Sequence, residues 1–239
     1  MNHYFITGTS RGIGKAIALA LLEDPGHHVT GLSRSCSISH PNYTHISIDL
    51  SDAEEVKRFR FPALKDPGKI ALINNSGTLG GVKYAGEMDA QRVTEAIHVN
   101  LLAPVCLTNE FLAAYVSENV TQVIINISSG AGKNPIDGWS VYCTAKAGLD
   151  MFSRVVAEEQ KLRGRKNVHV FSVAPGIVDT AMQDEIRKSE KKNFSRIGQF
   201  SDYKTSGQLA EPALISAKYL TILELPKKFT ETVFSVKDV

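Results

Sequence analysis

The stretch TGTSRGIG, residues 7–14, decides the fold class of this chain. It places Gly8, Gly12 and Gly14 directly after the strand-like run HYFIT and at the start of a helical pattern. Glycine suits these positions because the chain turns sharply, a phosphate approaches the backbone, and the helix packs closely on the strand. The free N–H groups of a helix N-terminus also attract an anion. The stretch therefore predicts a dinucleotide-binding loop, although tight turns from strand to helix use glycine anyway.

Strand-like and helical patterns alternate along the rest of the chain. Apolar runs typical of strands occur at 3–7, 27–33, 43–49, 69–74, 121–128 and 167–175, and helical patterns at 13–23, 89–117 and 142–162. Strands separated by helices of this length form βαβ units, which produce a parallel sheet with helices on both faces. The sequence therefore predicts an α/β fold, a Rossmann-type doubly wound sheet in a single domain over residues 1–239.

The polar segment 179–210 has a helical composition and little strand signal. An insertion at the carboxyl edge of such a sheet is where a lid over a ligand lies. We expect a small helical substrate-binding lid here, with a plain surface hairpin as the alternative.

Composition and charge limit the partners and the compartment. The net charge of +2 is too small to indicate a nucleic-acid partner. Three cysteines without a CxxC pair and seven histidines without ligand spacing indicate neither a disulfide framework nor a metal site. No signal sequence is apparent, and no apolar run approaches the length of a membrane span. These features predict a cytoplasmic protein without a membrane partner.

Basic residues near the second predicted strand favour NADP(H) over NAD(H). An acid at the end of that strand selects a ribose 2′-hydroxyl, whereas arginine accommodates a 2′-phosphate. This chain has Arg34 there, no acid nearby in the sequence, and Arg11 inside the glycine loop. The alternative is that both arginines are ordinary surface residues that bind no cofactor. Asp49, after the third strand, is expected to accept from the adenine amino group or else to cap the following helix.

A tyrosine and a lysine, Tyr142 and Lys146, lie four residues apart in YCTAK, one turn of a helix. A phenol titrates near pH 10, and a neighbouring cation lowers its pKa toward the range useful for acid–base catalysis. The pair by itself is more typical of a lysine stem packed on an aromatic ring. Ser129 ends a buried strand where its hydroxyl can bind a substrate carbonyl, and Asn100 can connect Lys146 to solvent through a water.

Six motifs occur in the order and approximate spacing of one enzyme family. They are TGTSRGIG, NNSG (74–77), HVN ending at Asn100, NISS containing Ser129, YCTAK (142–146) and APGIVDT (174–180). In these motifs the chain resembles the short-chain dehydrogenases/reductases over nearly its whole length. The resemblance implies a catalytic tetrad of Asn100, Ser129, Tyr142 and Lys146. Hydride passes from nicotinamide to a carbonyl carbon, Tyr142 donates the proton, Ser129 orients the oxygen, and Lys146 lowers the tyrosine pKa and holds the ribose.

The resemblance also implies which residues hold NADPH/NADP+. Pro175 and Gly176 are expected to face the nicotinamide, and Val178 and Thr180 to contact its carboxamide. The full set comprises Gly8, Ser10, Arg11, Gly12, Ile13, Gly14, Arg34, Asp49, Leu50, Asn75, Ser76, Gly77, Tyr142, Lys146, Pro175, Gly176, Val178 and Thr180.

Within the family, the residues around GW, YC and DTAMQ resemble the benzil reductase and sepiapterin reductase branch. That branch implies NADPH-dependent reduction of vicinal dicarbonyls or related ketones, a homodimer, and Trp139 and Met182 as pocket walls beside Ser129 and Tyr142. Sepiapterin reductases hold the pterin through an acid near the C-terminus, where this chain has Ser235 and Val236 with Asp238 displaced. A 1,2-diketone substrate is therefore favoured over a pterin. A dinucleotide-binding regulator without catalysis is the alternative from another class.

Overall fold

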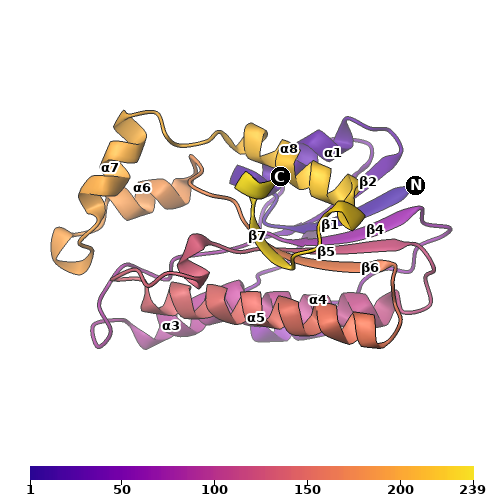
Figure 1. Ribbon diagram of the computed structural model, residues 1–239, viewed down its shortest axis with the longest axis horizontal. Coiled ribbons are helices and arrows are strands. Elements are labelled where there is room, and N and C mark those ends of the chain that lie inside the picture. Colours follow the sequence, from indigo (N-terminus) through magenta and orange to yellow (C-terminus); the bar gives the residue numbers. More distant parts are fainter.

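The computed structural model describes residues 1–239 and confirms the parallel α/β fold (Figure 1). Seven parallel strands pair in the order β3-β2-β1-β4-β5-β6-β7. Their bounds are β1 (Asn2–Thr7), β2 (His27–Ser33), β3 (Tyr43–Ser47), β4 (Lys69–Asn74), β5 (Thr121–Ile127), β6 (Val168–Ala174) and β7 (Val233–Ser235). Six strands match the predicted runs closely. The sequence patterns do not predict β7, because three residues are too few to show a period.

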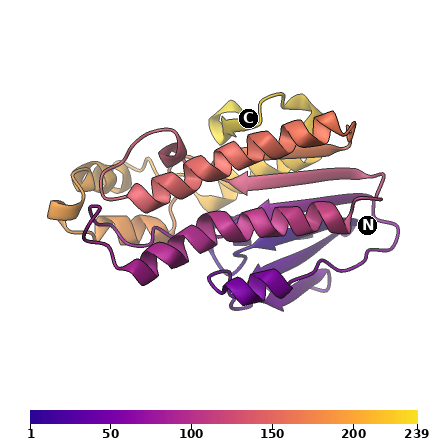
Figure 2. The same cartoon turned by 90° about the horizontal axis from the view of Figure 1, so that it is seen from below.

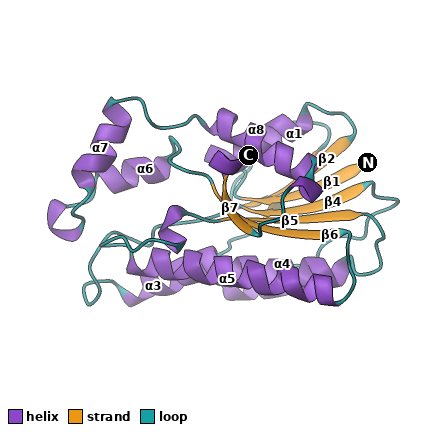
Figure 3. Cartoon of the chain, in the orientation of Figure 1, coloured by secondary structure: helices purple, strands orange, loops and turns teal.

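Helices cover both faces of the sheet, as Figures 1 and 2 show from two directions. On one face lie α1 (Gly12–Leu22) and α8 (Pro212–Glu224), whose Ile17 and Tyr219 are fully buried in one apolar core. The other face carries α4 (Ala103–Ala114) and α5 (Ser140–Leu162), with a second core. A short helix, α2 (Ala53–Arg58), follows β3. The strands thus form a buried middle layer between two helical layers (Figure 3).

One long helical run crosses the sheet on the α5 side. It consists of α3 (Ala90–Ile97), a π-helical turn (His98–Leu102) and α4. By length and composition this run of 25 residues could cross a membrane, which corrects the sequence-based expectation that no segment approaches such a span. In the folded chain Leu107 and Phe111 are buried in the core against the sheet, so it is a core helix.

The carboxyl ends of all the strands meet at one edge, because the sheet is parallel. The chain passes from β1 to β2 on one side and returns to β4 on the other, so the strand order switches between β1 and β4. Ligands of open α/β sheets bind in the crevice outside such a switch point. Segment 179–210 folds into α6 (Ala181–Arg187) and α7 (Ile197–Thr205), which project beyond this edge in Figure 1.

Candidate active site

Residues just after β4 form hydrogen bonds that hold the glycine loop between β1 and α1. Asn75 Nδ2 donates to Thr7 O at 2.9 Å and to Gly8 O at 3.2 Å. Thr7 Oγ1 in turn accepts from the backbone N–H groups of Asn75 and Ser76, both at 2.9 Å. A Cβ on Gly14 would lie 2.5 Å from Gly8 O and 2.3 Å from Asn75 Nδ2. Because these atoms leave no room for a Cβ, the side of the loop that packs on Asn75 requires glycine at position 14.

The other side of the loop is open, which is what a dinucleotide needs. Gly12 has a φ of +60°, and a Cβ there would meet only Thr180 Cγ2, at 3.6 Å. Gly176 has a φ of +75°, with no atom within 4 Å of a Cβ. The predicted loops 7–14 and 174–180 therefore approach each other at Gly12 and Thr180, and the N-terminal N–H groups of α1 suit a pyrophosphate. The loops fit the expected cofactor.

The other residues expected to bind the cofactor near the glycine loop differ in how exposed they are and in what they contact. Arg11 is the exposed residue that precedes α1, while Ile13 packs against the α1 core. The Ser10 carbonyl accepts from Ser37 Oγ at 2.9 Å. Val178 is buried and forms an isolated bridge with Ala210, so only its backbone is near the loop surface. Pro175 lies between the end of β6 and Gly176.

Arg34 and Asp49 lie together at the far end of the same edge. The Arg34 guanidinium is 3.9 Å from the Asp49 carboxylate, so an acid is near Arg34 in space although none is near it in the sequence. Asp49 does not cap α2, which corrects one alternative: the helix begins at Ala53, and Asp52 accepts from its first N–H groups. Asp49 instead accepts from Ser51 N at 2.9 Å.

A hollow of about 420 Å³ opens between these groups. Its charged lining residues are two arginines and two acids, and the others come from β3, the segment after it and the end of α2: Arg34, Arg58, Asp49, Glu55, Ile46, Ser47, Ile48 and Phe59. Arg58 belongs to α2, which the sequence patterns do not predict, so no sequence signal identifies it as a site residue. Leu50 is buried beside the hollow, and its carbonyl accepts from His98 Nδ1 at 3.1 Å.

Asn100 lies in the π-helical turn and is fully buried. Its Nδ2 donates to Thr78 O at 2.7 Å and its Oδ1 accepts from Thr78 N at 3.1 Å. A Cβ on Gly77 would lie 3.0 Å from Asn100 Oδ1 and 3.8 Å from Lys146 Nζ. The asparagine thus clamps the segment after β4 beside the lysine. π-Helical turns widen the helix locally and occur frequently at functional sites.

Tyr142 and Lys146 lie on the buried face of α5, under the end of β5. The Lys146 Nζ atom donates to Ile127 O at 2.8 Å and is 5.6 Å from the centroid of the Tyr142 ring. Ser129 follows β5 and accepts from Ala131 N at 3.2 Å in a short helical turn. The four residues predicted as a tetrad are therefore gathered around one point at the carboxyl edge.

The pKa of Tyr142 differs from the sequence-based expectation. Burial raises it to about 12, and the hydroxyl of Ser129 opposes this rise. Burial also lowers the pKa of Lys146 to about 8, with the Asp150 carboxylate acting in the opposite direction. The ammonium group donates to a carbonyl oxygen rather than to the phenol, so desolvation exceeds its stabilising effect on the phenolate.

Trp139 connects the site to the lid helices. Its indole stacks on Phe194 at 5.4 Å between ring centroids and contacts Tyr142 edge-on at 5.7 Å. Phe194 is fully buried, although it belongs to the 179–210 insertion. Met182, on α6, packs against the same cluster. The two residues expected as pocket walls thus lie beside Tyr142, with Trp139 covered by the insertion.

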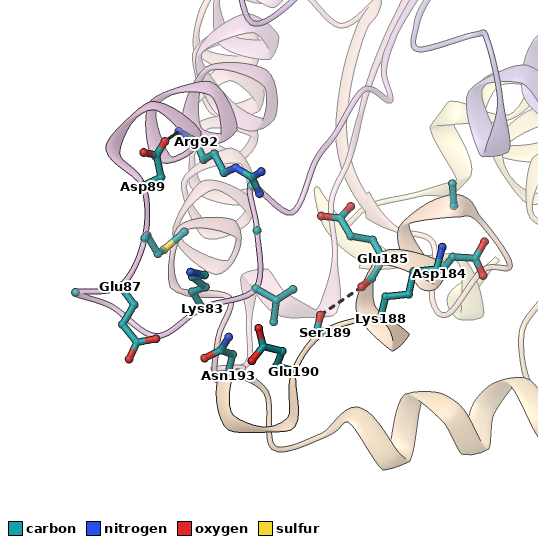
Figure 4. A pocket seen from close by; sticks show the side chains of 16 residues that line it. Lys83, Glu87, Asp89, Arg92, Asp184, Glu185, Lys188, Ser189, Glu190 and Asn193 are labelled. Atoms are coloured by element: carbon teal, nitrogen blue, oxygen red, sulfur yellow. Dashed lines mark hydrogen bonds between the residues drawn. The ribbon is translucent and has the colours of Figure 1, made fainter.

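A cavity of about 990 Å³ lies between α6 and the loop after β4 (Figure 4). Its lining is mainly polar and includes Lys83, Arg92, Glu185 and Lys188. Tyr142 and Ser129 do not line it. The sequence analysis did not find this cavity, although the glycine-rich run 80–86 was a possible signal for an open loop.

The fold and the motif positions define a class of protein. Residues 2–191 match the family described as short chain dehydrogenase, and the chain belongs to that family. It is 41% identical over 231 residues to the benzil reductase ((S)-benzoin forming) of Bacillus subtilis (strain 168), covering 94% of both chains. It is 31% identical over 241 residues to the sepiapterin reductase of Mus musculus, covering 92% of this chain and 90% of that one. A solved short chain dehydrogenase/reductase from Saccharomyces cerevisiae has a TM-score of 0.86 at 26% identity, covering 100% of this chain and 97% of its own.

Proposed function

We propose that this oxidoreductase reduces one carbonyl group of a 1,2-diketone or a related ketone with NADPH. The observation that carries the proposal is the burial of Tyr142 beside Ser129 at the open end of the glycine loop, in a chain 41% identical to a benzil reductase. A bound nicotinamide supplies the hydride. The protein supplies a proton donor, a carbonyl-binding hydroxyl and a dry site.

Each member of the tetrad has a separate task. Tyr142 holds its proton at neutral pH, because its pKa of about 12 is far above 7, and donates that proton to the oxygen of the reduced carbonyl. The Ser129 hydroxyl donates to the same oxygen and orients it. Lys146 offers an ammonium to the ribose side of the cofactor. Asn100 keeps the loop at Thr78 in place beside that ammonium.

The aromatic cluster around Trp139 supports a planar, apolar substrate. Phe194 and Phe200 of the insertion cover the indole, with ring centroids 5.4 and 5.5 Å from its own. The insertion therefore acts as a lid that must open for substrate to enter. Closure excludes water from Tyr142, which strengthens the hydrogen bonds to the reacting oxygen. This lid role deepens the proposal of a diketone with aromatic substituents.

The proposed function is tested with purified protein, NADPH and benzil, by following the loss of the reduced nicotinamide absorbance. We expect NADPH consumption and one molecule of hydroxyketone for each NADPH consumed. Isatin and a pterin with a dicarbonyl side chain are the comparison substrates. Folded protein that binds NADPH but consumes none with any of these carbonyls would refute the proposal.

A pterin substrate is the second candidate, and the C-terminus disfavours it. Asp238 is the acid nearest to the position where sepiapterin reductases are expected to bind the pterin. Its carboxylate accepts from Ser235 N at 2.9 Å in a capping box, while Val236 is buried. A carboxylate that already caps a turn is less available to a guanidine-like pterin edge.

The preference for NADPH rests on Arg34, whose side chain is 74% exposed beside the hollow. Replacing Arg34 with Ala removes a bidentate donor to the 2′-phosphate, and we expect KM for NADPH to rise about 10-fold or more. KM for NADH should stay within about twofold, because NADH lacks that phosphate. Arg196→Ala, on the lid, is the control with unchanged cofactor constants. Equal effects on both cofactors would contradict the assignment of Arg34.

We also propose that the chain forms a homodimer through α4 and α5. Leu102, Met151 and Val155 lie on neighbouring helices and are 44%, 57% and 48% exposed. The pair on α5 is one helical turn apart, and Leu101 lies beside the same helix, since a Cβ on Gly148 would be 3.2 Å from Leu101 Cδ2. Apolar side chains gathered on adjacent helices typify homodimer interfaces, which are less polar than ordinary surface.

For the dimer, Val155→Lys introduces a charge at the centre of the proposed contact, so we expect a shift from dimer to monomer in sedimentation velocity. Leu214→Lys, on the opposite side of the sheet at a residue that is 67% exposed, is the matched control and should remain dimeric. A monomeric parent protein, or a dimer unaffected by Val155→Lys, contradicts this interface.

A further inference from the structure

One buried acid near the site has no place in the proposed reaction. Asp150 follows Lys146 by one turn of α5 and is only 6% exposed. Its Oδ1 accepts a hydrogen bond from Ser172 Oγ at 2.6 Å, on strand β6. Its Oδ2 lies so close to the backbone of the turn after β5 that a Cβ on Gly132 would be 2.8 Å away. The carboxylate therefore has one hydrogen-bond donor and packs closely on the turn after β5.

Lys146 is buried as well, with 3% of its surface exposed. The elements packed on it present neutral groups: the Ile127 carbonyl of β5, Asn100 of the π-helical turn, and the backbone at Gly77. On its own helix the titratable groups one turn before and one turn after it are Tyr142, whose ring centroid is 5.6 Å from Nζ, and the buried Asp150. A buried ammonium without a counter-ion tends to lose its proton, and Asp150 is the one carboxylate among these neighbours.

We propose that Asp150 is a positioning residue that keeps Lys146 charged. This inference rests on the proposed function, since it assigns Asp150 to the lysine of the tetrad. Ser172 Oγ donates to the carboxylate, but it is the negative charge of Asp150 that acts on Lys146. The Asp150 carboxylate then acts on the Lys146 ammonium across one turn of α5, the i, i+4 separation. Asp150 itself contacts neither substrate nor cofactor.

The first test needs neither substrate nor cofactor. The folded state lowers the pKa of Lys146 from 10.5 to about 8, so the unfolded chain binds more protons between these values. The free energy of unfolding should therefore rise with pH through this window. Asp150→Asn removes the opposing charge, so the rise should begin about one pH unit lower. Lys146→Met should abolish this component of the rise. The measurement is urea unfolding of each protein from pH 6 to 10.

Ser172→Ala is the matched control, because it breaks the same hydrogen bond but retains the carboxylate. Ser172→Ala should lower the free energy of unfolding, but the pH at which that free energy begins to rise should stay the same as in the parent protein. If Asp150→Asn alone fails to fold, the double variant with Lys146→Met should fold, because no unpaired charge is then buried. An onset unchanged in Asp150→Asn, an equal shift in Ser172→Ala, or an unfolded double variant would overturn the coupling.

The second test is the pH profile of diketone reduction. In Asp150→Asn the alkaline decline of kcat should move about one pH unit lower, while Ser172→Ala keeps the parent profile. If kcat of Asp150→Asn declines at the same alkaline pH as kcat of the parent protein, the proposal is contradicted. A parent protein that reduces no diketone refutes the proposed function only, since the unfolding profile still measures the pairing of Asp150 with Lys146.

Discussion

Replacing Tyr142 with Phe is expected to reduce kcat for diketone reduction by about 1,000-fold, because a positioned general acid contributes this order of rate enhancement. The ring, its edge-on contact with Trp139 and its burial are all retained, so the fold and NADPH binding should change little. The measurement is steady-state NADPH oxidation with benzil, together with NADPH affinity from the quenching of tryptophan fluorescence.

Tyr219→Phe is the matched control for that experiment. Tyr219 is also buried, and its hydroxyl donates to Val173 O at 3.1 Å from α8, on the face of the sheet opposite α5. The control should lose some stability, because it removes one of the two donors to this buried carbonyl, the other being Ser128 N at 3.0 Å, but keep kcat. A Tyr142→Phe protein with parent activity would instead support a dinucleotide-binding regulator, for which the hydroxyl has no catalytic role.

Replacing Gly14 with Ala is expected to destabilise the chain by about 3 kcal/mol and to abolish cofactor binding, because overpacking at rigid contacts costs this much. The new Cβ would meet Gly8 O at 2.5 Å and Asn75 Nδ2 at 2.3 Å. One neighbour is backbone and the other holds the loop through hydrogen bonds to Thr7 and Gly8, so neither can move freely. Thermal unfolding and titration with NADPH measure the two losses.

Gly198→Ala provides the same substitution near the start of a helix with open space around it. It should leave NADPH binding unchanged and stabilise the chain by about 0.5 kcal/mol, since alanine loses less conformational entropy than glycine in a helix. If Gly14→Ala bound NADPH as tightly as Gly198→Ala, the close packing under the glycine loop would not be needed for the site.

Local patterns predicted most of the fold because periodicity is a local property. The strands from β1 to β6 and the helix α5 were all visible as apolar runs or helical spacing. The segment α2 and the strand β7 were not, since their six and three residues are too short for a period to emerge. The helix over 90–114 was predicted as one stretch, but its apolar character was underestimated.

The sequence by itself determined the fold class, the glycine loop and the ordered motifs that carry the proposed tetrad. Each of these is a pattern within a short segment, or the order of such segments along the chain. Only the tertiary structure decided that Arg34 meets Asp49, that Phe194 covers Trp139, and that Ser172 donates to Asp150. These contacts join residues from different elements. They arise because a parallel sheet brings distant strand ends to one edge, and that convergence leaves no local trace in the sequence.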